Sequence, residues 1–285
     1  MKLQGSLIPG GLVIGKVASG DRVIFGGQKL DLLPDGTFVA GFGRDASREI
    51  LLEVGVSCRQ VIKLANREYR IQRVEGVPRE TVTPSKEHLA RIARERKLVR
   101  AAKERAIKRP DILLSVIEGF QWPVVGPISG VYGSQRYYNG VPGSPHYGVD
   151  IALPTGTPVH APASGIVTLA EEDLFYSGGT IILDHGYRLS SSFLHLSRVS
   201  VSVGDEISQG DVLGEIGSSG RATGASLRRR TTVPFHMPLT PSVLTILPSA
   251  SPMPLYSTEG TSWRAATACC AIHAITPFLG LETPD

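Results

Sequence analysis

The sequence predicts a mainly β protein of two domains joined by a charged helix. The 285 residues include 32 glycines and 20 prolines, and this abundance of turn-forming residues is typical of loop-rich β proteins. Short apolar runs of strand length recur between the turns, and a single long stretch follows a helical period instead. The chain is long enough for two domains, each with its own core.

Residues 1–80 are predicted to form a small β-rich module. Val23-Ile24-Phe25 is followed by Gly26-Gly27, and Thr37-Phe38-Val39-Ala40 comes directly after Asp35-Gly36. Strands of this length, broken by Gly-Gly and Asp-Gly turns, are typical of a small antiparallel sandwich. We expect this module to serve as a spacer or as a docking module.

Residues 81–118 are predicted to form a charged linker helix. Leu89, Ile92 and Val99 recur near helical spacing, and charged residues fill most of the positions between them. Within this region Thr83-Pro84 is expected to open the helical pattern, which runs to Arg109, and Pro110 is expected to close it. Its basic face could bind an anionic polymer, but we favour a solvent-exposed linker, because charge runs are usually solvated.

Residues 119–247 are predicted to form the domain that carries the chemistry. His146 and Asp150 lie four residues apart in a segment of β character. The even separation places both side chains on one face of a strand, where an imidazole and a carboxylate could bind Zn²⁺. By itself this spacing is weak evidence, because a turn histidine near an unrelated aspartate produces the same pattern by chance.

The segments around this pair supply the missing context. Pro145-His146-Tyr147-Gly148-Val149-Asp150-Ile151-Ala152 is followed, in order, by Pro154-Thr155-Gly156-Thr157-Pro158, Gly179-Thr180-Ile181-Ile182-Leu183-Asp184-His185-Gly186 and Phe193-Leu194-His195-Leu196-Ser197. In this order, and over about residues 130–224, the segments closely resemble the LytM/lysostaphin family of peptidoglycan metalloendopeptidases.

The resemblance implies a fold of the duplicated-hybrid-motif type, in which an antiparallel β-sheet forms a groove with a zinc ion at its floor. It also implies cleavage of peptide cross-links in bacterial peptidoglycan, and therefore a periplasmic or cell-envelope location. His146 and Asp150 correspond to two zinc ligands, and His195 to a catalytic histidine. The alternative for His195 is a strand histidine whose ring is satisfied by a backbone carbonyl. His160 and His185 match no functional position, and we interpret them as structural or rim residues.

The sequence departs from the family's pattern near its end. The family places His-x-His shortly after an Ala-Thr-Gly turn, but here the turn at 222–224 is followed by Ala-Ser-Leu-Arg. By position, Ser226 replaces a catalytic histidine and Arg228 replaces the third zinc ligand. Because a guanidinium carries a fixed positive charge and has no acceptor, we expect weakened zinc binding. His236 lies downstream, but the intervening Pro234 disfavours it as a replacement.

The composition also changes at this point. Residues 248–285 form a tail rich in Pro, Ser, Thr and Ala without sustained periodicity, which predicts an irregular or disordered segment. The abrupt change suggests that the reading frame of the coding sequence shifts near residue 225, so that the tail is out of frame. Likewise, no signal peptide is visible ahead of Leu3, which would fit a truncated start.

Charge and hydropathy limit the remaining function classes. The formal net charge of +4 is too small to indicate a polyanionic partner by itself. No nucleic-acid-binding motif and no run of about 18 apolar residues is visible in the sequence. Two hypotheses follow: a zinc endopeptidase of peptidoglycan, or a catalytically degenerate module that binds the cell wall or regulates a partner hydrolase of the envelope.

Overall fold

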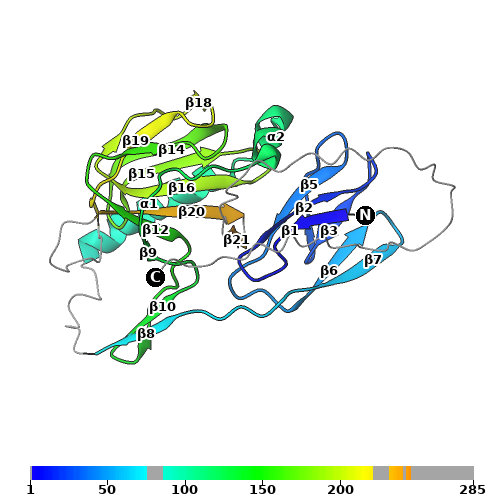
Figure 1. Ribbon diagram of the computed structural model, residues 1–285, viewed down its shortest axis with the longest axis horizontal. Helices are drawn as coiled ribbons and strands as arrows, with labels where there is room; N and C mark the ends of the chain where they lie inside the picture. Colours follow the sequence, from blue (N-terminus) through cyan, green and yellow to red (C-terminus); the bar gives the residue numbers. More distant parts are fainter. Residues whose placement is uncertain (1, 76–85, 221–230, 240–241, 245–285) are drawn as a thin grey trace.

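The computed structural model describes residues 2–75, 86–220, 231–239 and 242–244, the last two ranges by their backbone. Ser226, Arg228 and the predicted tail at 248–285 therefore lie outside the described residues. Over the described residues the fold is mainly β with antiparallel sheets, as predicted. A smaller lobe built from the first strands and a larger lobe built around one long sheet lie end to end (Figure 1).

The smaller lobe consists of two antiparallel sheets with a common apolar core. Its strands are β1 (Lys2–Gly5), β2 (Leu12–Lys16), β3 (Val23–Phe25), β4 (Gln28–Lys29), β5 (Thr37–Gly41), β6 (Glu49–Val54) and β7 (Cys58–Lys63). One sheet has the order β1-β2-β5, and the other has the order β4-β3-β6-β7. Val23, Phe38 and Leu52 are fully buried in the core. The small sandwich predicted for this region is confirmed.

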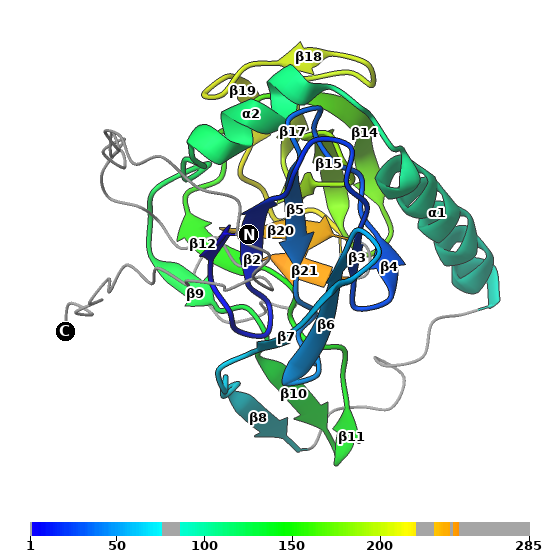
Figure 2. The same cartoon turned by 90° about the vertical axis from the view of Figure 1, so that its right-hand side faces the viewer.

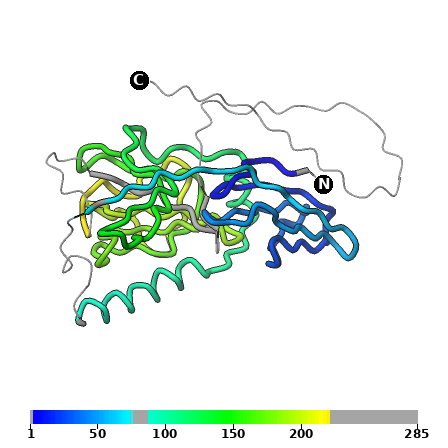
Figure 3. The backbone as a smooth tube through the Cα atoms, turned by 90° about the horizontal axis from the view of Figure 1, so that it is seen from below, coloured from blue at the N-terminus to red at the C-terminus, as the bar shows by residue number. Residues whose placement is uncertain are grey.

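The chain then runs along the length of the molecule to the larger lobe (Figure 3). There β8 (Ile71–Val74) pairs in parallel with β10 (Gln135–Tyr138), which also pairs with β11 (Val141–Pro142). Arg44 of the smaller lobe adds a second connection, since its Nε donates to the carbonyl of Gly133 at 2.9 Å. Its guanidinium also lies 4.4 Å from the ring centroid of Tyr69. The two lobes are therefore held together by backbone pairing and by side chains.

The larger lobe is organised by a long sheet of strand order β18-β14-β15-β16-β20-β12-β9, with β21 paired to β20. These strands are β9 (Ile128–Gly130), β12 (Val149–Leu153), β14 (Gly165–Leu174), β15 (Gly178–Asp184), β16 (Ser190–Leu196), β18 (Glu206–Ile207), β20 (Thr231–Leu239) and β21 (Ser242–Leu244). A small sheet, β13-β19-β17, is formed by β13 (Pro158–His160), β17 (Arg198–Val199) and β19 (Val212–Glu215).

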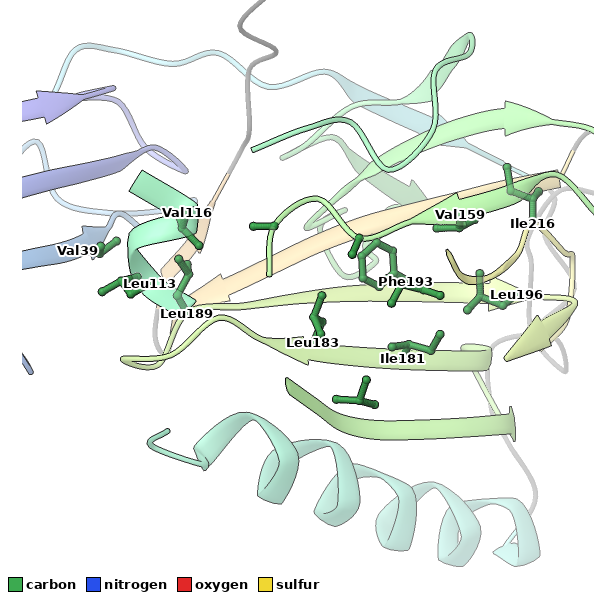
Figure 4. Close-up of a cluster of buried hydrophobic side chains, with 14 of the residues drawn as sticks. Val39, Leu113, Val116, Val159, Ile181, Leu183, Leu189, Phe193, Leu196 and Ile216 are labelled. Carbon is green, nitrogen blue, oxygen red and sulfur yellow. The ribbon is translucent and has the colours of Figure 1, made fainter. Parts of the chain in front are cut away.

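One face of the long sheet carries the main apolar core (Figure 4). Ile181, Leu183 and Phe193 are fully buried there. Helix α2 (Pro110–Glu118) contributes Leu113 and Val116 at one end of the same cluster, beside Leu189. The same core includes Leu33 and Val39 of the smaller lobe. Burial of this apolar surface is the main stabilising contribution to the lobe and to its junction with the first one.

Helix α1 (Lys86–Glu104) lies on a different side of the sheet from α2 (Figure 2). Ala102 is buried against Leu169, Leu174 and Ile182 of β14 and β15, so one side of the charged helix is packed and is not solvent-exposed along its whole circumference. The helical region also differs from the prediction at Pro110, which begins α2 and does not end α1. Proline suits this position because the first turn of a helix does not use its N–H groups.

Strand β20 occupies a central place in the sheet, between β16 and β12. Its register pairs Pro234 with Asp150 and His236 with Ser192. A proline has no N–H to give to a neighbouring strand and is normally confined to sheet edges, so this segment is a poor central strand. Among the described residues, no helix combines the length and apolar character needed to cross a bilayer.

Candidate zinc site and its surroundings

His146 and Asp150 lie side by side where the chain enters β12. The Nε2 atom of His146 is 3.0 Å from Oδ1 of Asp150. The imidazole is held from behind, because its Nδ1 is 3.1 Å from the carbonyl oxygen of Val131, which can only accept a hydrogen bond. The backbone of His146 is fixed as well, donating to Ser134 and accepting from Gly133. The loop at 131–134 thus directs Nε2 toward the aspartate.

The protonation of this pair is set by competing effects. Burial lowers the pKa of His146, but the hydrogen bond and the negative charge of Asp150 outweigh it, so the net shift is upward. The upward shift favours the protonated ring, in which the proton on Nε2 faces the carboxylate. A metal ion bound by both groups would replace that proton, which makes metal affinity dependent on pH.

His195 lies on β16 at a bulge. Phe193 and Leu196 are both buried in the core, although residues three apart in a regular strand point to opposite faces. The pairing with β15 explains why both side chains are buried. Gly179 pairs with Leu196 and Ile181 pairs with Phe193, so β16 holds one more residue than β15 between these two pairs. The extra residue is accommodated by His195, whose φ of 62° is in the left-handed region. Such bulges change the direction of a side chain and are common next to active sites.

The bulge turns His195 toward the face of the sheet that carries Asp150. The register aligns Val149 with Phe193 through β20, and both side chains are buried on the core side. Asp150 and Leu194, the next residues in each strand, consequently point to the opposite face. Because of the bulge, the side chain of His195 lies on the same face as Asp150 and Leu194. The strands that carry His195 and Asp150 are separated by β20, so their backbones are roughly 10 Å apart at ordinary strand spacing.

The ring of His195 has one nitrogen committed to a backbone group. Its Nδ1 lies 2.8 Å from the carbonyl oxygen of Ser219, so Nδ1 carries the hydrogen and Nε2 of the neutral ring has the free lone pair. The backbone carbonyl of the alternative interpretation is therefore present. The side chain is only partly buried, however, and that bond leaves Nε2 uncommitted for proton transfer.

The family model described as "Peptidase family M23" matches residues 144–233, which include His146, Asp150 and His195. The segment that carries these residues is therefore similar to peptidase family M23. Residues 144–233 are called the M23 domain below. This agrees with the resemblance to LytM and lysostaphin that the sequence segments indicate.

Several curated proteins resemble part of the chain. The chain is 37% identical over 84 residues to the peptidoglycan DD-endopeptidase ShyA of Vibrio cholerae, covering 30% of this chain and 19% of that protein. It is 35% identical over 97 residues to lysostaphin of Staphylococcus simulans, covering 34% of this chain and 20% of that protein. The chain thus spans about a fifth of the length of these relatives.

A solved structure assigned to peptidase M23, from Pseudomonas aeruginosa, resembles more of the chain. It is 26% identical with a TM-score of 0.62, and the match covers 84% of this chain and 92% of that one. The likeness therefore extends beyond the M23 domain into the preceding strands and helices.

Two other histidines of the M23 domain have structural partners. His185 is fully buried, with Nδ1 2.7 Å from the carbonyl of Ser164 and Nε2 2.6 Å from the hydroxyl of Ser191. Burial lowers the pKa of His185 to about 4, so the ring is neutral. His160 contacts the carbonyl of Gly210 through Nδ1 at 2.8 Å. These bonds fit the structural roles predicted for both residues.

The described residues contain no group of three or more His, Cys, Asp or Glu side chains arranged to hold a metal ion. His146 and Asp150 form a pair, and the family's third-ligand position, Arg228, lies outside the described part of the chain. Sequence reasoning missed two residues that shape this region, Gly130 beside Asp150 and Ser219 beside His195. The triplet Ser218-Ser219-Gly220 was the only local signal for the second, and nothing near Gly130 marked the first.

Proposed function

We propose that the M23 domain is a zinc-dependent endopeptidase that acts on the peptide cross-links of bacterial peptidoglycan. His146 and Asp150 would hold the zinc ion, and His195 would be the catalytic partner. The observation that supports this most directly is the His146 Nε2–Asp150 Oδ1 contact of 3.0 Å within a matched M23 segment. One relative is named a peptidoglycan DD-endopeptidase and another a DD-carboxypeptidase/endopeptidase, and these names support the substrate class.

His146 and Asp150 fit a zinc ion in the type of their ligand atoms and in the orientation of the imidazole. Zinc accepts imidazole nitrogen and carboxylate oxygen, and the hydrogen bond from His146 Nδ1 to Val131 leaves Nε2 as the ligand atom. When bound in an open site, zinc lowers the pKa of a water molecule to about 7 and polarises the scissile carbonyl. Three protein ligands are usual at such a site, so the described pair would make up two of them.

His195 would transfer a proton in this reaction. Its Nδ1 donates to the carbonyl of Ser219, so Nε2 can accept a proton or, once protonated, donate it to the leaving amine. The side chain is partly exposed on the face that carries Asp150, where a bound peptide could reach it. The cell envelope is the compartment in which this substrate occurs. The smaller lobe would be the surface for an envelope partner.

A second candidate function is supported by a specific feature of the sequence. Ser226 and Arg228 stand where the family has two histidines, and a guanidinium cannot serve as a zinc ligand. On this alternative the M23 domain binds peptidoglycan, or regulates a partner hydrolase, without cleaving a bond.

One set of variants distinguishes the two functions. Zinc content and turnover of cross-linked muropeptides are measured for the unmodified chain, for His146→Ala and for Ser226→His/Arg228→His, which we call the repaired chain. His160→Ala is the matched control, because this histidine also contacts a backbone carbonyl within the M23 domain.

Cleavage by the unmodified chain that is lost in His146→Ala and kept in His160→Ala supports the peptidase. Cleavage by the repaired chain alone supports the binding module. If neither chain cleaves muropeptides and neither retains zinc, the proposed peptidase function is wrong.

A further inference from the structure

A single serine contacts both the backbone and the ring of His195. The hydroxyl of Ser219 donates to the carbonyl of Leu196 at 2.7 Å and accepts the N–H of Gly179 at 2.8 Å. The carbonyl of Ser219 accepts the Nδ1–H of His195 at 2.8 Å. Leu196 and Gly179 face each other in the ladder between β16 and β15, directly at the bulge. Ser219, which lies outside the sheet, therefore connects β15 and β16 at the bulge.

We propose that Ser219 is a positioning residue for His195. Its hydroxyl stabilises the bulge, and its carbonyl selects the neutral tautomer that carries the hydrogen on Nδ1. Nε2 is thereby left as the basic nitrogen on the face of Asp150. This inference rests on the proposed catalytic role of His195, since positioning a histidine in this way matters for catalysis only if that ring transfers a proton.

The conformation of His195 explains why such support is needed. A φ of 62° is disfavoured for a residue with a side chain, and such conformations persist where surrounding contacts impose them. The N–H of His195 is tied to the carbonyl of Ser177 at 2.7 Å, which fixes one side of the bulge. The hydroxyl of Ser219 fixes the other side through Leu196. Together these bonds define the backbone from which the imidazole projects.

The packing around Ser219 leaves little freedom for a different arrangement. A Cβ atom added at Gly178 would lie 2.1 Å from Oγ of Ser219, and one added at Gly217 would lie 2.0 Å from the backbone nitrogen of Ser197. The segment at 217–220 is thus in direct contact with β15 and with the end of β16. This close approach brings the Ser219 carbonyl within hydrogen-bond distance of the ring.

The tautomer of His195 provides a test that is independent of peptidase activity. Nitrogen NMR of the unmodified chain should show the neutral His195 ring as a single tautomer with the hydrogen on Nδ1. In Ser219→Ala the ring should exchange between both tautomers, because the carbonyl is no longer held in place. Ser218→Ala is the control, since Ser218 is exposed, and it should leave the spectrum of His195 unchanged.

Kinetics of the repaired chain add a second readout. Adding Ser219→Ala should lower kcat about 10- to 100-fold, as loss of an orienting partner typically does, with little change in KM. If the repaired chain cleaves nothing, the proposed function fails, but the tautomer measurement still tests Ser219. The inference is overturned if neutral His195 carries its hydrogen on Nε2, or if Ser219→Ala leaves the tautomer unchanged. Should Ser219→Ala not fold, the tautomer of the unmodified chain decides.

Discussion

The carboxylate of Asp150 occupies space that a side chain at Gly130 would need. Gly130 pairs with Asp150 across the β9–β12 ladder, and a Cβ atom added to it would lie 2.3 Å from Oδ2 of the aspartate. His146 contacts the other oxygen, Oδ1, at 3.0 Å. The lack of a side chain at Gly130 therefore leaves room for the orientation in which the Asp150 carboxylate contacts His146.

Replacing Gly130 by alanine should damage the proposed zinc site. The added methyl group would collide with the Asp150 carboxylate. We expect the carboxylate to move and to lose its contact with His146. We expect about 10- to 100-fold weaker zinc binding in the repaired chain, comparable to the loss of a ligand-orienting contact. Calorimetric zinc titration measures this. Gly143→Ala is the control, since the nearest atom to its added Cβ is 3.1 Å away; equal losses in both variants would count against the explanation.

Asp184 and His185 should give opposite pH dependences of stability. Burial raises the pKa of Asp184 from 3.8 to about 7, so the folded chain binds the extra proton and this contribution is lost as pH rises through that range. Burial lowers the pKa of His185 from 6.5 to about 4, so the unfolded chain binds the extra proton and stability is lost as pH falls through that range.

Urea unfolding at several pH values tests this pair. Relative to the unmodified chain, Asp184→Asn should become more stable as pH rises from about 4 to 7, and His185→Gln should become less stable over the same range. The change expected is roughly 4 kcal/mol for Asp184→Asn and roughly 3 kcal/mol for His185→Gln, each across its own window. Slopes of the same sign in the two variants would contradict the assignment.

The core beneath α2 should depend on Leu113. Its side chain is fully buried with Val116 and Phe193, and truncation leaves a cavity. We expect Leu113→Ala to lower the free energy of unfolding by about 2–5 kcal/mol. The neighbouring Leu114 is 48% exposed, so Leu114→Ala should cost less than about 1 kcal/mol. Similar losses for the two variants would mean that α2 does not pack as described.

The reading-frame hypothesis is tested on the coding sequence. Ala-Thr-Gly at 222–224 matches the family's pattern and the following residues do not, while β20 carries Pro234 at a central position of the sheet. We expect another frame, read from about residue 225, to encode a His-x-His equivalent and a sequence of strand character without proline. If no frame does so, the hypothesis is wrong and the departure belongs to the protein itself.

Local features could be predicted from the sequence. The turns around β3 and β5 and the closeness of His146 and Asp150 are readable in a few residues. The resemblance indicated the LytM/lysostaphin family and His195, whose catalytic role stays a prediction. The bulge at His195 could not be predicted, because it arises from the register of β16 against β15, which no short window contains. The role of Ser219 could not be predicted for the same reason, because its partners Leu196 and Gly179 are distant from it in the sequence.

The helical region illustrates a different limit. Its charges predicted a solvated linker, but Ala102 packs on the sheet and the short helix begun by Pro110 buries Leu113. A charged sequence indicates which side of a helix faces water, and the packed side is determined by the neighbouring strands.

Calorimetric titration of the repaired chain with zinc, with and without His146→Ala, tests most directly whether His146 and Asp150 hold the metal. We expect the repaired chain to bind zinc stoichiometrically and far more tightly than the unmodified chain. Adding His146→Ala should abolish this binding, and adding His160→Ala should not. Zinc binding that is equally tight with and without His146 would contradict the assignment of the His146–Asp150 pair as the metal site.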